Sequence, residues 1–232
     1  MKDKLEGIIL SLSPYGETGT LAQVLTKEAG YLSFVAKGSA KLSAKNRLMP
    51  LCRCRFLFDY KEGKTIFTLQ QKELLKSYYS SDLKELSFKN VLTEMVSRLR
   101  PEETADVYED LLFVLENYDK QKEALLGCFL TSRLLHYAGI APYTDGCVVC
   151  GKSTVQGFSV QKGGFLCAEH VTEAERCDLP ELRRIRYLEI AGKEKVLRIP
   201  EDYTLEDWDR YIDFLKRHAD TRLRSYDFYR QL

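Results

Sequence analysis

Long apolar runs are missing from this 232-residue chain. The longest, such as Gly7–Leu10, fall far short of the roughly 20 residues that a transmembrane helix needs. The beginning of the chain also lacks the apolar core of a secretory signal peptide, because Glu6 and Gly7 interrupt it early. We therefore expect a cytoplasmic protein that does not span a membrane.

Compositional bias is missing as well, since 44% of the residues are hydrophobic and 30% are charged. These values are those of an ordinary globular protein and exclude a disordered, collagen-like or repetitive chain. The length allows one large domain or two to three small ones. The seven cysteines are an odd count, which in a reducing compartment favours core packing or metal binding over disulfides.

Catalytic signatures are not found either. None of His136, His170 and His218 precedes a glutamate by two positions, as a zinc deaminase requires. The H-E-x-x-H motif of metalloproteases and the G-x-S-x-G motif of serine hydrolases are also missing. The sequence therefore predicts a protein that is not an enzyme.

Acidic residues are missing from one particular segment. The net charge is only +1, but residues 1–80 hold 13 Lys and Arg against 7 Asp and Glu. From Ala29 to Phe58 there is no acidic residue at all. A surface of this kind attracts polyanions, although a solvated basic loop is the simpler interpretation. The basic residues of this segment are Lys37, Lys41, Lys45, Arg47, Arg53 and Arg55.

The first 80 residues have the pattern of short strands separated by turns. In the fourth segment Cys52, Cys54, Phe56, Phe58 and Tyr60 alternate with other residues, which is typical of a strand with one buried face and with Arg53 and Arg55 on the other. Five short strands in about 75 residues favour a small closed barrel of the OB-fold type. The expected strands are Leu5–Ser13, Thr20–Lys27, Tyr31–Ala36, Cys52–Tyr60 and Thr65–Gln71, with a turn at Ser13–Gly16.

Helical periodicity follows the strands. Apolar residues recur at helical spacing in residues 88–99, 107–118 and 126–137, which predicts three amphipathic helices that pack as a bundle. Two more helical segments are expected at Pro180–Ala191 and Leu205–Tyr229. The fold class is therefore α+β and multidomain. The predicted domains are a barrel over residues 1–80 and a helical domain over residues 81–232, with a zinc-ribbon-like segment inserted at residues 145–178.

That inserted segment carries the strongest motif. Cys147 and Cys150 form one pair of ligands three residues apart, and Cys167 and His170 form a second pair. This spacing matches the two knuckles of a structural zinc ribbon, and residues 158–165 read as the hairpin between them. Three sulfurs and one nitrogen close the coordination shell, so the sequence predicts one structural zinc ion.

Three other interpretations of this motif stay open. The four residues can be unrelated core positions, or Cys177 can replace His170 as the fourth ligand. In addition, Gly146–Ser153 satisfies the letter pattern of a phosphate-binding P-loop. A P-loop has to follow an apolar strand and begin a helix, and neither flank of this segment predicts that.

The basic segment also fits a known binding mode of OB barrels. Single-stranded nucleic acid is held there by a positively charged groove with aromatic side chains on which bases stack. We expect DNA contacts from Lys37, Lys41, Lys45, Arg47, Arg53 and Arg55. Tyr15, Tyr31 and Phe34 are the aromatic residues expected to offer stacking surfaces.

Taken together, these segments resemble the bacterial RecO recombination-mediator family over essentially the whole chain. The resemblance is carried by Val35–Ser39, Leu48–Leu51, Gly139–Tyr143 before Cys147–Gly151, Gly163–Cys167 and Leu223–Phe228. Members of the family commonly have an arginine pair after the Lys-Gly dipeptide, whereas this chain has Ser39-Ala40-Lys41. This difference shifts the expected phosphate contacts toward Lys41 and Lys45.

The resemblance implies a nucleoid-associated DNA-repair protein. Such a protein binds single-stranded and double-stranded DNA and anneals complementary strands. It works with RecR to load RecA onto DNA covered by single-strand-binding protein. Two alternatives from other classes are an adaptor that recruits partners through its helices, with the barrel as a scaffold, and a nucleotide-binding enzyme that uses Gly146–Ser153.

Overall fold

The computed structural model describes residues 2–39, 47–199 and 202–232. The chain forms two compact units. Unit 1 consists of Met1–Leu115 and Leu223–Leu232, and unit 2 consists of Glu116–Arg222. Among the helices described, none is long and apolar enough to cross a membrane.

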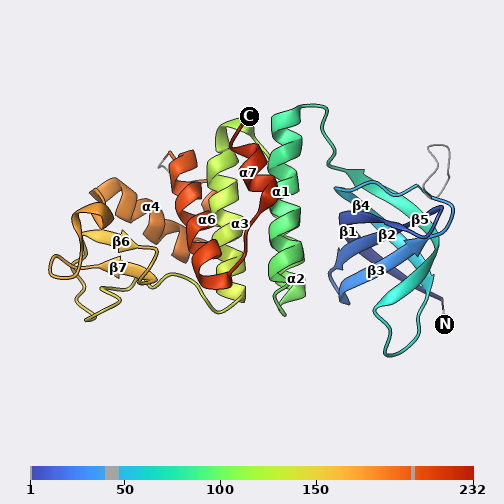
Figure 1. Cartoon of the computed structure of the whole chain (residues 1–232), viewed down its shortest axis with the longest axis horizontal. Coiled ribbons are helices and arrows are strands. Elements are labelled where there is room, and N and C mark those ends of the chain that lie inside the picture. The colour runs from blue at the N-terminus through green and yellow to red at the C-terminus, as the bar shows by residue number, and fades with distance from the viewer. Residues whose placement is uncertain (1, 40–46, 200–201) are drawn as a thin grey trace. The chain divides into compact units, whose positions relative to one another are not determined.

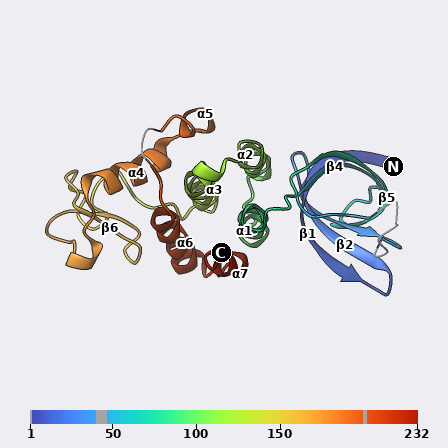
Figure 2. The same cartoon turned by 90° about the horizontal axis from the view of Figure 1, so that it is seen from above.

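Unit 1 begins with a closed five-stranded barrel, which Figure 2 shows as a ring. The strand order around the barrel is β1-β2-β3-β5-β4, and all neighbours are antiparallel except β3 and β5. This arrangement is the OB fold and confirms the predicted fold class. The strands are β1 (Lys2–Tyr15), β2 (Gly19–Thr26), β3 (Gly30–Ala36), β4 (Cys52–Asp59) and β5 (Ile66–Ser77).

The turn expected at Ser13–Gly16 begins later than predicted, because β1 continues through Pro14 to Tyr15. A proline lacks the amide hydrogen of a strand, so it is tolerated where one side of the strand has no neighbour. Strand β4 pairs with β1 only as far as Ile8, whereas Pro14 lies opposite Thr20 of β2 alone. Pro14 therefore lies on a stretch of β1 that has a neighbouring strand on one side only.

The barrel interior is filled by the inward-facing residues of all five strands. Phe34 stacks on Phe56 with 4.8 Å between ring centroids, and Phe58 meets Phe34 edge-on at 5.0 Å. Cys52 and Cys54 are buried in the same core, as predicted. Burial raises the pKa of the Cys54 thiol to about 11, so this cysteine stays protonated and acts as an apolar side chain.

Helices α1 (Leu83–Leu99), α2 (Thr104–Glu116) and α7 (Arg224–Tyr229) complete unit 1. The Asp82 side chain caps α1 by accepting a hydrogen bond from the Glu85 amide. Helix α7 packs on α1, and its first turn is bound to the Glu94 carboxylate, which accepts hydrogen bonds from the amide and the hydroxyl of Ser225. The end of the chain is therefore part of the unit that holds the barrel.

Unit 2 contains α3 (Glu123–Tyr137), α4 (Leu179–Ile190), α5 (Lys193–Val196) and α6 (Leu205–Ala219), together with the short hairpin β6 (Gly157–Ser159) and β7 (Gly164–Leu166) (Figure 1). Short 3-10 turns lie at η1 (Lys120–Lys122) and η2 (Glu173–Glu175). The prediction of a single helical segment over Leu205–Tyr229 is wrong. The chain leaves the helix at Asp220, whose φ of 47° is left-handed and ends α6 before α7 begins.

Helix α6 packs against α3 through Trp208, which is fully buried. Its indole nitrogen donates a hydrogen bond to Thr131 Oγ1 over 3.1 Å. Gly127 on α3 leaves the space that the indole ring fills, since a Cβ atom there would lie 2.4 Å from a ring carbon. The contact between the two helices thus depends on the absence of a side chain at this position.

We expect Gly127→Ala to lower the free energy of unfolding by about 1–3 kcal/mol, because overpacking outweighs the better helix propensity of alanine. Urea denaturation of the purified protein measures this change. Gly192→Ala is the control, since a Cβ there meets no atom within 4 Å and only an N-cap is altered. It should cost at most about 1 kcal/mol. Equal stability of the Gly127→Ala variant and the wild type would contradict this account of the α3–α6 contact.

Candidate metal centre and nucleic-acid interface

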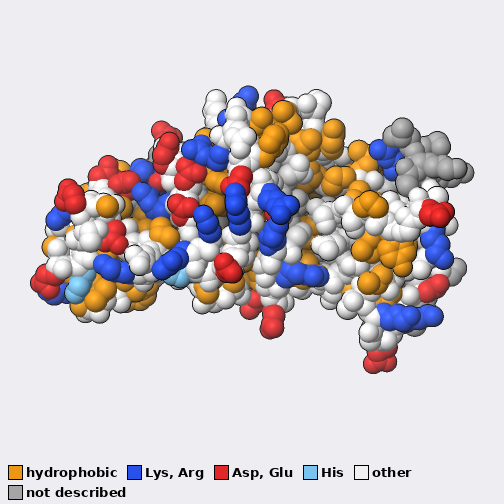
Figure 3. Space-filling view, viewed as in Figure 1, with side chains coloured by type: hydrophobic (Ala, Val, Ile, Leu, Met, Phe, Trp, Pro, Cys, Tyr) orange, Lys and Arg blue, Asp and Glu red, His pale blue; other side chains and the backbone are white. Residues whose placement is uncertain are grey.

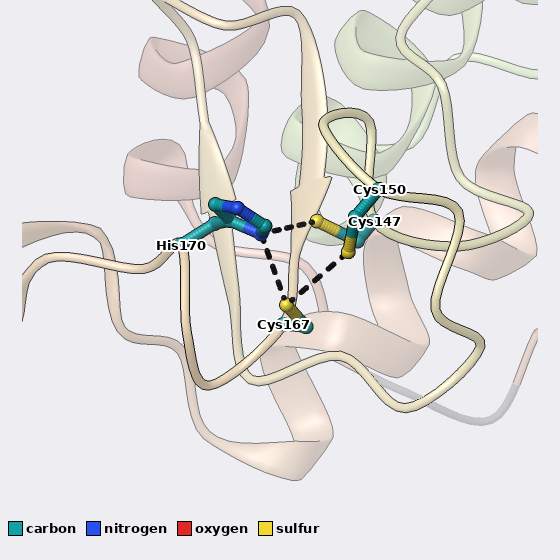
Figure 4. A group of neighbouring side chains, drawn as sticks. All are labelled: Cys147, Cys150, Cys167 and His170. Carbon is teal, nitrogen blue, oxygen red and sulfur yellow. Dashed lines mark hydrogen bonds between the residues drawn. The ribbon is translucent and has the colours of Figure 1, made fainter.

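Four side chains from two turns of unit 2 converge on one point (Figure 4). Cys147 and Cys150 lie in the turn before β6, and Cys167 and His170 lie in the turn after β7. The hairpin of β6 and β7, with Phe158 opposite Phe165, brings these two turns together as predicted. Cys147 and Cys167 are buried, whereas Cys150 is exposed.

The four ligand atoms lie close enough together to surround one tetrahedral metal ion. All four lie within 4.8 Å of one another. His170 Nδ1 is 3.5 Å from Cys147 Sγ and 3.3 Å from Cys167 Sγ, and the sulfurs of Cys150 and Cys167 are 3.7 Å apart. A tetrahedral ion with metal–sulfur bonds of about 2.3 Å and metal–nitrogen bonds of about 2.0 Å requires edges of roughly 3.5–3.8 Å. The cluster can therefore hold one metal ion with a closed shell.

The first turn has the backbone geometry that two neighbouring ligands need. The amide of Gly151 donates to the carbonyl of Cys147 over 2.8 Å, and the amide of Cys147 donates to the carbonyl of Lys152 over 2.8 Å. Gly151 has a φ of +75°, which glycine adopts without strain. In the second turn the His170 amide donates to the Cys167 carbonyl over 3.1 Å. Each pair of ligands is thus fixed by a closed backbone loop.

Backbone amides also prepare one of the thiols for metal binding. Burial alone would raise the pKa of Cys147, but hydrogen bonds from the amides of Cys167, Cys150 and Val149 outweigh it and lower this pKa to about 6. Cys147 is therefore a thiolate at neutral pH, the form that binds a metal. The Lys152 amide lowers the pKa of Cys150, but burial and the hydrogen bonds to the neighbouring thiols of Cys147 and Cys167 outweigh it, so this pKa is raised.

Two of the alternative interpretations find no support in this geometry. Cys177 lies outside the cluster, and its sulfur instead contacts the carbonyl of Glu175 at 3.7 Å. Gly146–Ser153 forms the first ligand turn and is followed by the strand β6 rather than by a helix. It therefore lacks the helix N-terminus on which a P-loop binds phosphate.

The residues predicted to contact DNA fall into three groups. Lys37 is exposed directly after β3, and Arg47 is exposed before β4, where its carbonyl accepts a hydrogen bond from the Lys72 ammonium. Lys41 and Lys45 lie outside the described residues. Arg53 and Arg55 lie on β4 and are both engaged in ion pairs.

The two arginines of β4 differ in their surroundings. Arg53 donates from Nε to the Glu6 carboxylate of β1 over 2.6 Å, and the Tyr108 hydroxyl of α2 donates to the same carboxylate over 3.1 Å. Burial disfavours the charge of Arg53, but the hydrogen bond to Glu6 outweighs it and raises the pKa of the guanidinium. Arg55 pairs with Glu73 in a more exposed position, with an N–O distance of 2.7 Å. Arg53 thus connects two strands and a helix.

The expected stacking surfaces need one correction. Phe34 faces the barrel interior and is fully buried, so the prediction that it stacks on bases is wrong. Tyr31 is covered by the Arg100 guanidinium, 4.9 Å from the ring centroid, and burial raises its pKa to about 12. Tyr15 is 51% exposed at the end of β1.

Sequence reasoning missed one exposed aromatic residue of the barrel. The alternation along the fourth strand groups Tyr60 with the buried residues Phe56 and Phe58. The strand ends at Asp59, however, and Tyr60 is 47% exposed. The Glu62-Gly63-Lys64 turn is the sequence signal that the strand was about to end.

Comparisons with known proteins agree with this architecture. A family model described as "Recombination protein O N terminal" matches residues 1–78, and one described as "Recombination protein O C terminal" matches residues 80–227. The chain is 30% identical over 225 residues to the DNA repair protein RecO of Bifidobacterium longum subsp. infantis, covering 89% of this chain and 92% of that protein. It is 27% identical over 184 residues to the DNA repair protein RecO of Bacillus cereus strain B4264, covering 75% and 72%.

The four-residue cluster predicts the stoichiometry of metal binding. We expect the wild-type protein to bind one equivalent of cobalt(II), measured by the visible absorbance of a tetrahedral thiolate complex. Cys150→Ser and His170→Ala should each weaken this binding by more than about 100-fold, because a ligand itself is lost. Cys177→Ser is the matched control and should bind cobalt like the wild type. Loss of binding in that variant would contradict the assigned ligand set.

A second prediction separates the two arginines of β4. We expect Arg53→Gln to lower the free energy of unfolding by about 1–3 kcal/mol, because the buried side of the Glu6 carboxylate loses its charged donor. Arg55→Gln should change it by no more than about 1 kcal/mol, since the exposed pair is screened by water. Chemical denaturation of both variants measures the difference. Equal losses of unfolding free energy in the two variants would show that Arg53 does not connect β1, β4 and α2.

Proposed function

Because the chain belongs to the recombination protein O family, which places it in DNA repair and recombination, we propose that it acts as a recombination mediator. In this role it binds single-stranded and double-stranded DNA and anneals complementary strands. Together with RecR it helps to load RecA onto single strands covered by single-strand-binding protein. The names of the relatives and the OB barrel support this proposal.

The observation that carries the proposal is the basic, acid-free segment on the OB barrel. Within this segment, Lys37 and Arg47 are exposed among the described residues. Lysine and arginine side chains bind the phosphates of nucleic acid and release its counterions. By neutralising the charge of two strands, these contacts lower the repulsion between the strands and allow them to pair faster. Lys41 and Lys45 belong to the same proposed phosphate-binding set.

The proposed roles of the two β4 arginines follow from their partners. Arg55 is 43% exposed at the side chain, so it can exchange Glu73 for a DNA phosphate. Arg53 contributes mainly by holding the β4 surface in place through Glu6. Both remain members of the proposed DNA-binding surface, but they act at different distances from the DNA.

We further propose that the ion held by Cys147, Cys150, Cys167 and His170 is zinc. Three thiolates and one imidazole are a donor set that suits zinc, and the closed shell leaves no open position for a reacting group. When bound, the ion supplies a cross-link between the two ligand turns. The metal centre is then a folding element of unit 2, and the DNA contacts are made by the barrel.

Titration of labelled oligonucleotides by fluorescence anisotropy tests the proposed function. We expect saturable binding of a single-stranded oligonucleotide, with an affinity that falls steeply as salt rises. Lys37→Glu should weaken binding to single-stranded and duplex DNA alike, and it should make the logarithmic salt slope less steep by about one unit for the lost phosphate contact. Lys195→Glu reverses an exposed lysine of unit 2 and serves as the charge-matched control.

Two results would argue against the proposal. If the wild-type protein binds neither DNA form at low salt, the family role does not depend on direct DNA contact by this chain. If Lys37→Glu and Lys195→Glu weaken binding equally, the effect is one of net charge, and the phosphate-binding surface is not the one assigned here.

A further inference from the structure

The connection between β4 and β5 exposes apolar surface at the edge of the barrel. Tyr60, directly after β4, is 47% exposed, and Ile66, the first residue of β5, is 53% exposed. The hairpin is labelled by its strands in Figure 1, and Figure 3 shows hydrophobic and basic side chains exposed on the barrel. A surface hollow of about 170 Å³ beside Tyr60 is lined by Asp59, Lys61, Lys64, Ile66, Phe67 and Thr68, and Tyr60 adjoins it through its contact with Phe67.

The Tyr60 ring is held in place although it is exposed. It stacks on Phe67 with 5.9 Å between centroids and 21° between ring planes. Phe67 is buried and in turn contacts Phe58 at 4.9 Å and Phe34 at 6.2 Å. The exposed tyrosine is thus the outer end of an aromatic cluster that begins in the barrel core. Holding the ring in this way lowers the entropy that is lost when a ligand stacks on it.

The charges of the hairpin cancel. Lys61 and Lys64 are balanced by Asp59 and Glu62, so the hairpin attracts a polyanion much less than the basic segment does. What the hairpin offers is an aromatic face with two lysines beside it. This combination suits a base that carries its own phosphate better than it suits an acidic or basic peptide.

The register of the sheet connects this hairpin to the basic segment. Strand β3 runs parallel to β5, with Phe34 opposite Phe67. Lys37 lies three residues beyond Phe34, which at about 3.3 Å per residue is roughly 10 Å along the strand. Farther along β5, Lys72 contacts the carbonyl of Arg47. A strand of nucleic acid that follows β5 from Tyr60 therefore comes near both Lys37 and Arg47.

We propose that the β4–β5 hairpin is a stacking site for an unpaired base, with Tyr60 as the platform, and that it makes the barrel prefer single-stranded over duplex nucleic acid. This inference rests on the proposed DNA binding by the barrel and adds a strand preference to it. Bases in a duplex are already stacked on each other and present only their edges, whereas an unpaired base exposes a face to the ring. The basic residues contact phosphates in both forms.

The test uses the full-length protein, a labelled oligothymidylate and a labelled duplex of the same length, each titrated at several salt concentrations. We expect Tyr60→Ala to weaken single-strand binding about 5- to 140-fold, the range of one stacked base, and to change duplex binding less than about twofold. The salt slope should stay that of the wild type. Tyr60→Phe should bind like the wild type, because its ring can still stack.

Tyr79→Ala is the matched control, since Tyr79 is a 52% exposed tyrosine of the same unit. It should bind both DNA forms like the wild type. Crosslinking with an oligonucleotide that carries iodouracil gives a second readout that does not depend on a variant that folds. The expected crosslink maps to the peptide that contains Tyr60.

The outcomes separate this inference from the function on which it rests. If Tyr60→Ala binds single strands within twofold of the wild type while Lys37→Glu is impaired, the stacking site is wrong and the DNA-binding barrel stands. Equal losses for both DNA forms, or a loss in Tyr60→Phe, would also overturn the stacking site. If the wild type binds no DNA, both proposals fail.

Discussion

Closure of the barrel through β1 is the constraint on which the rest of unit 1 depends. This strand pairs with β2 along most of its length and with β4 over its first half, so it completes the ring. Gly7 lies where β1 pairs with both β2 and β4, and the absence of a side chain there allows this close approach, because a Cβ atom would lie 2.5 Å from the Val24 side chain. Closure also places Glu6 where Arg53 and Tyr108 both reach it, which binds the helical part of the unit to the barrel. The exposed residues at the barrel rim have fixed positions because the ring is closed.

Local patterns in the sequence predicted most of the elements and the convergence of four possible metal-binding side chains. Short apolar and β-branched segments separated by turn residues predicted the five strands, with period-two alternation in the fourth, and the spacing of Cys147, Cys150, Cys167 and His170 predicted the cluster. These features depend on residues close together in the chain, where spacing alone determines which side chains can meet. Local spacing could not decide between His170 and Cys177 as the fourth ligand, because that choice depends on how a loop of several residues folds back.

Features that depend on distant partners were not accessible from the sequence. Phe34 belongs to the core because β3 lies next to β5, and Tyr60 leaves the core because β4 ends one residue earlier. The sequence pattern predicts that Arg53 is a surface charge, because its partner Glu6 lies 47 residues away in the chain. The break between α6 and α7 depends on a left-handed Asp220, which amphipathic periodicity does not reveal. In each case a contact between separate segments outweighs the local pattern.

The docking of α7 on α1 makes unit 1 discontinuous in the sequence, since its final ten residues follow the whole of unit 2. Unit 2 is a continuous segment and can fold while the chain is still being synthesised. The surface of α1 around Phe88, which contacts the Tyr229 ring, stays uncovered until residues 223–232 have been synthesised. Folding of the unit that carries the barrel therefore cannot be completed before a segment that follows unit 2 is available. A chain that stops before Leu223 leaves this apolar surface exposed to chaperones and proteases.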